Sequence, residues 1–158
     1  MPLKLTRQHF ESIRTHGSRD YPNECCGILL GRSSDQQKEV ADVVPLRNLR
    51  HDPDRAQAIL PVDSPAVESE RNRFLIDPTD QIRVEKDSRA RGLQVVGYYH
   101  SHPDHPARPS NYDRDHAWPW YSYVIISVQQ GTAGEMNSWV LRDDRSSFDL
   151  EPVEVMNP

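Results

Sequence analysis

The apolar residues of this chain fall into short runs that are separated by polar segments and turn residues. The most continuous runs lie at residues 25–32 (CCGILLGR), 93–99 (LQVVGYY) and 121–128, and each has the length of a buried β-strand. Residues 39–46 (EVADVVPL) are predicted to form a hairpin with the first run. Further strands are expected at residues 74–76, 135–141 and 148–155.

Two longer segments between these runs carry the signals of helices. Thr6 is a suitable N-cap for a helix over residues 7–19. Asp77 and Pro78 are suited to begin a second helix that continues to about Arg91, and Gly92 is a suitable C-cap. Strands interleaved with two long helices predict a mixed α/β domain.

The chain has the length of a single domain, which we assign to residues 1–158. Residues 48–72 do not follow the pattern, because they combine three prolines with many charges and few large apolar side chains. We therefore expect a long loop or insertion there, and such loops are often functional.

The composition excludes several classes of protein. The formal net charge of −5 argues against nucleic acid as a partner, since phosphate binding requires a basic face. The apolar runs are far shorter than a membrane span, and the N-terminus lacks the apolar core of a signal peptide. Cys25 and Cys26 are adjacent and are the sole cysteines, so no disulfide framework is expected. We therefore expect a cytoplasmic protein with no membrane association.

The strongest functional signal is a group of potential metal ligands that follows the run at residues 93–99. His100 and His102 are alternate residues, and alternate side chains of an extended chain point the same way, so both imidazoles can bind one ion. Asp113 lies 11 residues after His102, and Ser110 lies at helical spacing before it. Two histidines and one carboxylate, with an open position, make the ligand set of a catalytic zinc site.

Such a site requires a general base, and Glu24 is the candidate. It directly precedes an apolar run, where a buried carboxylate costs free energy unless it is paired or used. Zinc lowers the pKa of water toward about 7, and an unligated carboxylate nearby can then move the proton to the leaving group.

The pattern of Glu24, then His-Ser-His-Pro from His100, then Ser-x-x-Asp from Ser110 to Asp113, resembles the JAMM (MPN-plus) metallopeptidases. The segment from Glu24 to Gly31 also resembles the first strand of that family. The resemblance covers residues 6 to about 142. It implies a mixed central sheet flanked by two main helices, in a cytidine-deaminase-like architecture.

The resemblance also implies roles and a substrate. His100, His102 and Asp113 would bind one zinc ion, Glu24 would be the general acid/base, and Ser110 would hydrogen-bond the water or the developing oxyanion. The family cleaves amide and isopeptide bonds after the C-terminal Gly-Gly of ubiquitin-like proteins. This chain is most similar to the small bacterial stand-alone members that act on ubiquitin-fold sulfur-carrier proteins.

Several residues have other interpretations. The string from His100 to His105 also fits the H-x-H-x-D-H motif of metallo-β-lactamase-like hydrolases, but that site requires histidines further along the chain, where His116 alone remains. A deaminase-type zinc site is excluded because there is no C-x-x-C. We expect His105 and His116 to lie in solvent or beside the ligands. Cys25 and Cys26 are expected to be strand residues facing opposite sides, and Trp118 and Trp120 to be packing residues.

Two other functions remain open at this level. The same fold can serve as a protein-binding scaffold without turnover, and the same chemistry can hydrolyse small amides. A full set of ligands favours the peptidase, and the oligomeric state is not predicted.

Overall fold

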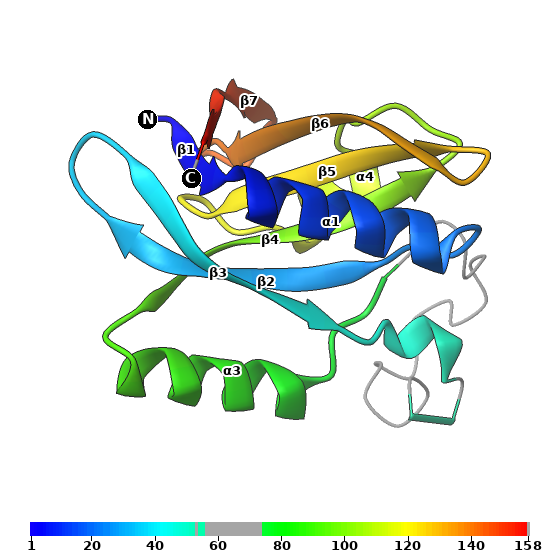
Figure 1. Ribbon diagram of the computed structural model, residues 1–158, viewed down its shortest axis with the longest axis horizontal. Coiled ribbons are helices and arrows are strands. Elements are labelled where there is room, and N and C mark those ends of the chain that lie inside the picture. Colours follow the sequence, from blue (N-terminus) through cyan, green and yellow to red (C-terminus); the bar gives the residue numbers. More distant parts are fainter. Residues whose placement is uncertain (53, 56–73, 158) are drawn as a thin grey trace.

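A mixed sheet of eight strands forms the centre of the computed structural model, which describes residues 1–52, 54–55 and 74–157 (Figure 1). The described helices are α1, α3 and the short α4, with one 3-10 turn, η1. The elements are β1 (Leu3–Thr6), α1 (Arg7–Asp20), β2 (Cys26–Ser33), β3 (Lys38–Leu46), η1 (Leu49–His51), α3 (Pro78–Ala90), β4 (Gln94–Pro103), α4 (Asn111–His116), β5 (Ser122–Gln129), β6 (Thr132–Leu141), β7 (Phe148–Glu151) and β8 (Val153–Met156).

The strand order is β7-β6-β5-β4-β2-β3-β1-β8. The pairs β4/β5, β1/β3 and β1/β8 are parallel, and the remaining pairs are antiparallel. The edge strands β7 and β8 are separated in the chain by Pro152 alone. Since two residues span at most about 7 Å, the sheet must curl until its edges approach each other at that end.

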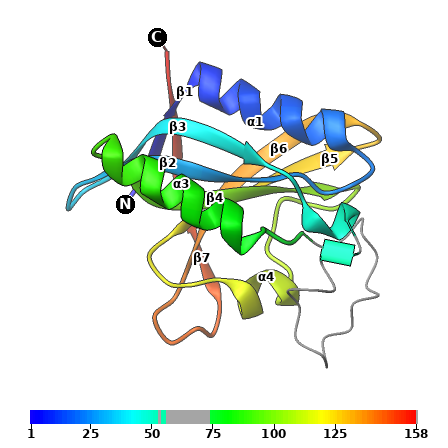
Figure 2. The ribbon, with the colours of Figure 1, turned by 90° about the horizontal axis from the view of Figure 1, so that it is seen from below.

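The curled sheet wraps around α1, which contacts strands on both halves of the sheet (Figures 1 and 2). The helix begins as predicted, because the Thr6 hydroxyl accepts a hydrogen bond from the His9 backbone N–H at 3.1 Å. Ile13 of α1 belongs to a buried cluster with Leu5, Leu29 and Val124. This cluster is the main hydrophobic core.

Helix α3 covers the opposite face of the sheet (Figure 2). Its Val84 packs in a second buried cluster with Ile28 and Leu30 of β2. The Asp77 carboxylate caps the helix by accepting from the Thr79 N–H at 2.9 Å, and Gly92 follows the helix with φ at 70°, as the sequence predicted. Even and odd positions of β2 thus supply the two cores.

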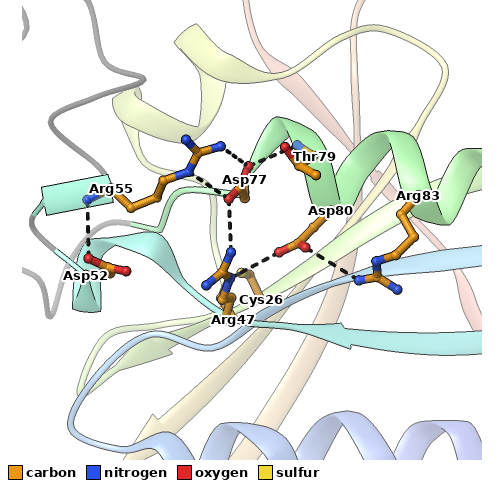
Figure 3. Close-up of polar contacts among 8 residues, drawn as sticks. All are labelled: Cys26, Arg47, Asp52, Arg55, Asp77, Thr79, Asp80 and Arg83. Carbon is orange, nitrogen blue, oxygen red and sulfur yellow. Dashed lines mark hydrogen bonds and ion pairs between the residues drawn. The ribbon is translucent and has the colours of Figure 1, made fainter.

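Ion pairs join the start of α3 to the end of β3 (Figure 3). The buried Asp77 carboxylate accepts from Arg47 at 3.0 Å and from Arg55 at 3.1 Å on both oxygens. The hydrogen bond from Arg55 is the main reason that the pKa of Asp77 is lowered to about 2. The network holds Arg55 against Asp77, the residue that caps the start of α3.

A buried ion pair lies near the point where the sheet edges approach. The Lys38 ammonium, at the start of β3, donates to the Trp120 carbonyl and to the Ser122 hydroxyl at 2.9 Å. It lies 3.6 Å from a carboxylate oxygen of Glu151, at the end of β7. Burial lowers the pKa of Lys38, and Glu151 opposes that shift.

Most predicted elements are confirmed to within a few residues, but the strand at 74–76 is wrong. The Leu75 N–H donates to the Asn48 side chain and its carbonyl accepts from the Leu49 N–H, so this backbone pairs with η1 and not with the sheet. The predicted strand at 148–155 is divided at Pro152, which lacks the N–H of a ladder. Strand β1 was not predicted.

The expected loop at 48–72 lies mostly outside the described residues, apart from the η1 turn and residues 52, 54 and 55. Within the described residues, every helix is too short or too polar to cross a bilayer.

Candidate metal centre

Strand β4 places two imidazoles on one face of the sheet. It runs through Pro103, so His100 and His102 lie within the strand and not, as predicted, just beyond its end. The strand continues because His100 pairs with Cys26 of β2 and with Ile125 of β5. The imidazoles of His100 and His102 point the same way because alternate residues of a regular strand face the same side of the sheet.

The intervening Ser101 points to the other face and fixes the neighbouring segment. Its buried hydroxyl accepts from the Cys25 N–H at 2.8 Å, and its own N–H donates to the Cys25 carbonyl at 3.2 Å. The middle residue of the His-Ser-His sequence therefore holds the chain that carries Glu24 against β4.

Helix α4 brings Asp113 to the histidines. The helix begins with a capping box, in which the Ser110 hydroxyl accepts from the Asp113 N–H at 3.1 Å and the Asp113 carboxylate accepts from the Ser110 N–H at 2.8 Å. This pair of hydrogen bonds fixes the Asp113 side chain. The Ser110 hydroxyl accepts in the cap and retains its proton for donation.

Four side chains converge at this point of the sheet. The Nε2 atoms of His100 and His102 are 3.1 Å apart. The Asp113 Oδ1 atom lies 3.2 Å from His100 Nε2, and its Oδ2 atom lies 3.2 Å from His102 Nε2. A carboxylate oxygen of Glu24 and one nitrogen of each histidine also lie within 4.8 Å of one another.

These separations fit a zinc ion. With metal–ligand bonds of about 2.0–2.1 Å in tetrahedral geometry, ligand atoms lie roughly 3.3 Å from one another. Two imidazole nitrogens and a carboxylate that approach to this distance form the donor set of a catalytic zinc site. The residues present therefore fit the metal that the sequence implies.

The tautomer of His102 suits metal binding. Its Nδ1 atom lies 2.9 Å from the Pro106 carbonyl oxygen, which can only accept, so Nδ1 carries the proton and Nε2 offers a lone pair. On the other side, the Phe74 ring stacks on the His100 ring with centroids 4.6 Å apart. The buried Nδ1 of His100 has no hydrogen-bond partner among the described residues.

The charges of the site are strongly coupled. Burial raises the pKa of the Asp113 carboxyl, but the His100 and His102 rings, when they are protonated at Nε2, outweigh it by charge and hydrogen bonding and hold that pKa well below its usual range. Asp113 is therefore ionised at neutral pH. A permanent negative charge beside two imidazole nitrogens favours a cation between them.

Glu24 is buried at the edge of the centre, as its proposed role requires. Its side chain is 2% exposed, and it stands just before β2. Its backbone carbonyl accepts from the Asn48 side chain at 3.0 Å. Asn48 also accepts from the Leu75 N–H at 2.9 Å, so it links the Glu24 segment to the chain entering α3. Neither Asn48 nor Phe74 carried a sequence signal, because each acts through contacts distant in the chain.

A cavity of about 510 Å³ opens beside the centre. Glu24, His102 and Ser110 reach it from three separate segments of the chain, and Arg108 and His105 also line it. Three prolines complete the wall. The Glu24 side chain and the His102 ring therefore border one cavity.

The structure does not support the H-x-H-x-D-H interpretation. The Asp104 carboxylate accepts from the Tyr21 hydroxyl at 2.6 Å and from the Gln130 N–H at 2.8 Å, so it is used in fixing the loop after β4. His116 is exposed and stacks on Tyr112, as expected for a residue that is not a ligand.

The cysteines are free and buried, one in each hydrophobic core. Burial raises the pKa of Cys25 to about 12 and holds that of Cys26 well above its usual value, so neither is suited to be a nucleophile. The expectation that the tryptophans are packing residues is wrong for Trp118, which is 67% exposed in the segment after α4. Trp120 is 40% exposed, and its ring lies against the Lys38 ammonium at 4.7 Å.

Comparisons with known proteins match most of the chain. The family described as prokaryotic homologs of the JAB domain matches residues 6–142. A desampylase of Haloferax volcanii is 32% identical over 79% of this chain and 80% of its own length. A probable TtuB-protein conjugate cleaving protease of Thermus thermophilus is 32% identical over 80% of this chain and 70% of its own. A CysO-cysteine peptidase of Mycobacterium bovis is 26% identical over 89% of this chain and 82% of its own.

Solved structures show the same fold. A Desulfitobacterium hafniense protein of known solution structure superposes with a TM-score of 0.76 at 30% identity, covering 99% of this chain and 94% of the other. A JAB1/MPN domain protein of Archaeoglobus fulgidus, at 15% identity, matches in fold with a TM-score of 0.52 over 98% of this chain and 96% of its own. The chain thus belongs to the prokaryotic JAB/MPN (JAMM) domain family.

Proposed function

We propose that this protein is a zinc-dependent peptidase or isopeptidase that hydrolyses the amide bond after the C-terminal Gly-Gly of a ubiquitin-fold sulfur-carrier protein. The observation that carries the proposal is the approach of Asp113 to both imidazoles at 3.2 Å, with the buried Glu24 carboxylate beside them. Relatives named for cleaving TtuB conjugates and CysO-cysteine supply the substrate class.

In this proposal Asp113, His100 and His102 hold the ion. Asp113 is assigned as the carboxylate ligand because its two oxygens each approach one imidazole nitrogen and its side chain is fixed by the capping box. A bound zinc ion would supply Lewis acidity toward the attacking water and the scissile carbonyl.

Glu24 performs the proton transfer. Its carboxylate takes a proton from the attacking water and returns it to the amine nitrogen as the carbon–nitrogen bond breaks, so no proton is gained or lost overall. Ser110 donates its hydroxyl proton toward the developing oxyanion while its oxygen stays in the cap. The cavity of about 510 Å³ is where both residues meet the substrate.

The sheet limits how a carrier tail can bind. Adding the tail as a further strand is not available at residues 97–100 of β4, since β2 and β5 pair with both its sides there and β7 and β8 form the edges of the sheet. We therefore propose that the tail crosses the end of β4 without extending this sheet. Glycines suit such a path because they lack the Cβ that would keep the backbone from the ion.

The test is hydrolysis of a carrier that carries an extra residue after Gly-Gly, followed by mass spectrometry. The purified protein should cleave it after zinc is added and stop when a chelator is present. Glu24→Gln should retain zinc but lose about 10²–10⁴-fold in kcat.

Full activity of Glu24→Gln would refute its role as the base. Zinc-loaded protein that binds the carrier and leaves it intact would make the domain a binding scaffold. Cleavage of small amides with the carrier left intact would make it an amidohydrolase.

A further inference from the structure

A second cavity, of about 400 Å³, opens on the metal-binding face of the sheet. We call it the aromatic pocket, because six rings line it: Phe74, Tyr98, Tyr112, His116, Trp118 and Tyr123. Its size falls in the range of about 300–1,000 Å³ that is usual for small-molecule sites. The proposed reaction has not yet used this pocket.

The tyrosine hydroxyls that line the pocket are already hydrogen-bonded within the protein. The Tyr98 hydroxyl accepts from the Gln81 side chain at 3.0 Å, and the Tyr123 hydroxyl accepts from the Trp118 N–H at 2.9 Å. Burial raises the pKa of Tyr123 to about 12, so it stays neutral. Among the described residues, no Asp, Glu, Lys or Arg lines the pocket. It therefore presents ring faces and suits an apolar or aromatic group.

The rings hold one another in place. Tyr98 and Tyr123 stack with centroids 5.7 Å apart, and Tyr112 and His116 stack at 4.0 Å. The Arg145 guanidinium lies 5.3 Å from the centre of the Trp118 ring, although Trp118 is largely exposed. A pocket whose walls are packed before a ligand arrives loses little entropy on binding.

The pocket shares a wall with the metal centre. Phe74, which lines it, stacks on the His100 ring at 4.6 Å. Tyr112, on its other side, directly precedes Asp113 in α4. Along β4, Tyr98 belongs to the aromatic pocket, His102 to the cavity that contains Glu24, and His100 lies between them. The aromatic pocket thus adjoins the metal-binding residues through Phe74 and Tyr112.

This position decides which part of the substrate can fill it, given the function proposed above, on which the argument rests. On the carbonyl side of the scissile bond, the two nearest residues are glycines and have no side chain to place there. We infer that the aromatic pocket binds a large apolar or aromatic side chain of the residue on the amine side of the scissile bond. It would make this enzyme selective for the group that it releases.

The selectivity can be measured with carriers that end in Gly-Gly-X, where X is Phe, Leu, Cys, Gly, Asp or Lys. We expect kcat/KM for Phe and Leu to exceed that for Gly by about 10–200-fold, the range over which apolar pockets discriminate. Asp should be cleaved most slowly. Equal rates for Phe and Gly, or a preference for Cys over Phe, would overturn the inference.

Two variants locate the selectivity in the pocket. Trp118→Ala should reduce the Phe-to-Gly ratio at least about tenfold. Trp120→Ala is the matched control, because it also removes an indole ring but from a residue that does not line the pocket. It should keep the wild-type Phe-to-Gly ratio. His116→Glu, at an exposed position, should shift the preference from Phe toward a Lys at X. An unchanged ratio in both pocket variants would place the selectivity elsewhere.

A binding experiment separates this inference from the proposed function. If zinc-loaded protein cleaves no carrier, the proposed function fails, and the pocket is then judged by titrating phenylalaninamide or glycinamide into the protein. Phenylalaninamide should shift the indole N–H resonance of Trp118, identified by its loss in Trp118→Ala, and glycinamide should not. Equal shifts from the two amides would refute the aromatic subsite independently of catalysis.

Discussion

The roles of the two carboxylates at the metal centre can be separated by zinc-linked stability. In Asp113→Asn, the amide oxygen can still accept from the Ser110 N–H, so the helix cap that the structure shows at 2.8 Å is retained while the charged ligand is lost. In Glu24→Gln, the three assigned ligands remain. We therefore expect zinc to stabilise Glu24→Gln like the wild type and Asp113→Asn far less.

The size of the effect follows from binding to the folded state. Free zinc at 1,000 times its dissociation constant stabilises a protein by about 4.1 kcal/mol. For a domain of this length, each kcal/mol shifts the melting temperature by about 2–4 °C, which predicts a rise of about 8–16 °C for the wild type. A metal-linked shift of this size is easily measured.

The assay is thermal unfolding by circular dichroism after chelator treatment, with and without zinc. Asp115→Asn is the matched control, since it removes an exposed carboxylate from the same helix and should leave the zinc shift intact. If Glu24→Gln lost the shift and Asp113→Asn kept it, the assignment of ligand and base would be reversed. If zinc shifted the melting temperature of neither the wild type nor any variant, the centre would not be a zinc site.

Three further predictions concern the scaffold. Gly27→Ala should lower the free energy of unfolding in urea by about 1–3 kcal/mol, because a Cβ there would overlap the ring and hydroxyl of Tyr99; an unchanged value would show that the ring can move. Lys38→Met should cost about 3–5 kcal/mol by leaving Glu151 buried without its cation, and adding Glu151→Gln should recover part of that loss in the same titration. The pKa of Asp77 falls from 3.8 to about 2 on folding, so its contribution to stability is complete above about pH 5 and is lost as the pH falls through 2. The stability difference between wild type and Asp77→Asn should therefore shrink between pH 5 and pH 2, and a constant difference would contradict this.

The sequence predicted those features that depend on neighbouring residues. Thr6 and Asp77 were identified as helix caps because a cap is set by chemistry within one turn. His100 and His102 were predicted to share a direction because the strand period is a local property. The approach of Asp113 required more, since spacing alone does not fold α4 back onto β4; the resemblance to a family supplied that step.

The features that sequence reasoning missed depend on contacts between distant parts of the chain. Strand β1 has few residues, and it forms by pairing with β8 at the other end of the sequence, as in the pair Leu3 and Val153. Asn48 and Phe74 similarly gain their roles from partners more than twenty positions away. No periodicity marks such residues.

Alternation along β4 explains how one strand can both hold a metal centre and keep it in place. His100 and His102 face α4, while Tyr99 and Ser101 between them face α1. The buried Tyr99 hydroxyl crosses Gly27 of β2 to reach His16 Nδ1 at 2.7 Å, and Ser101 binds the backbone of Cys25. The Ser101 contact therefore joins β4 to the segment that follows Glu24, and the Tyr99 contact passes across that segment. A general base must lie within about 3 Å of the atom whose proton it moves. In the proposed reaction, Tyr99 and Ser101 would therefore set how precisely Glu24 is placed, although neither would touch the substrate.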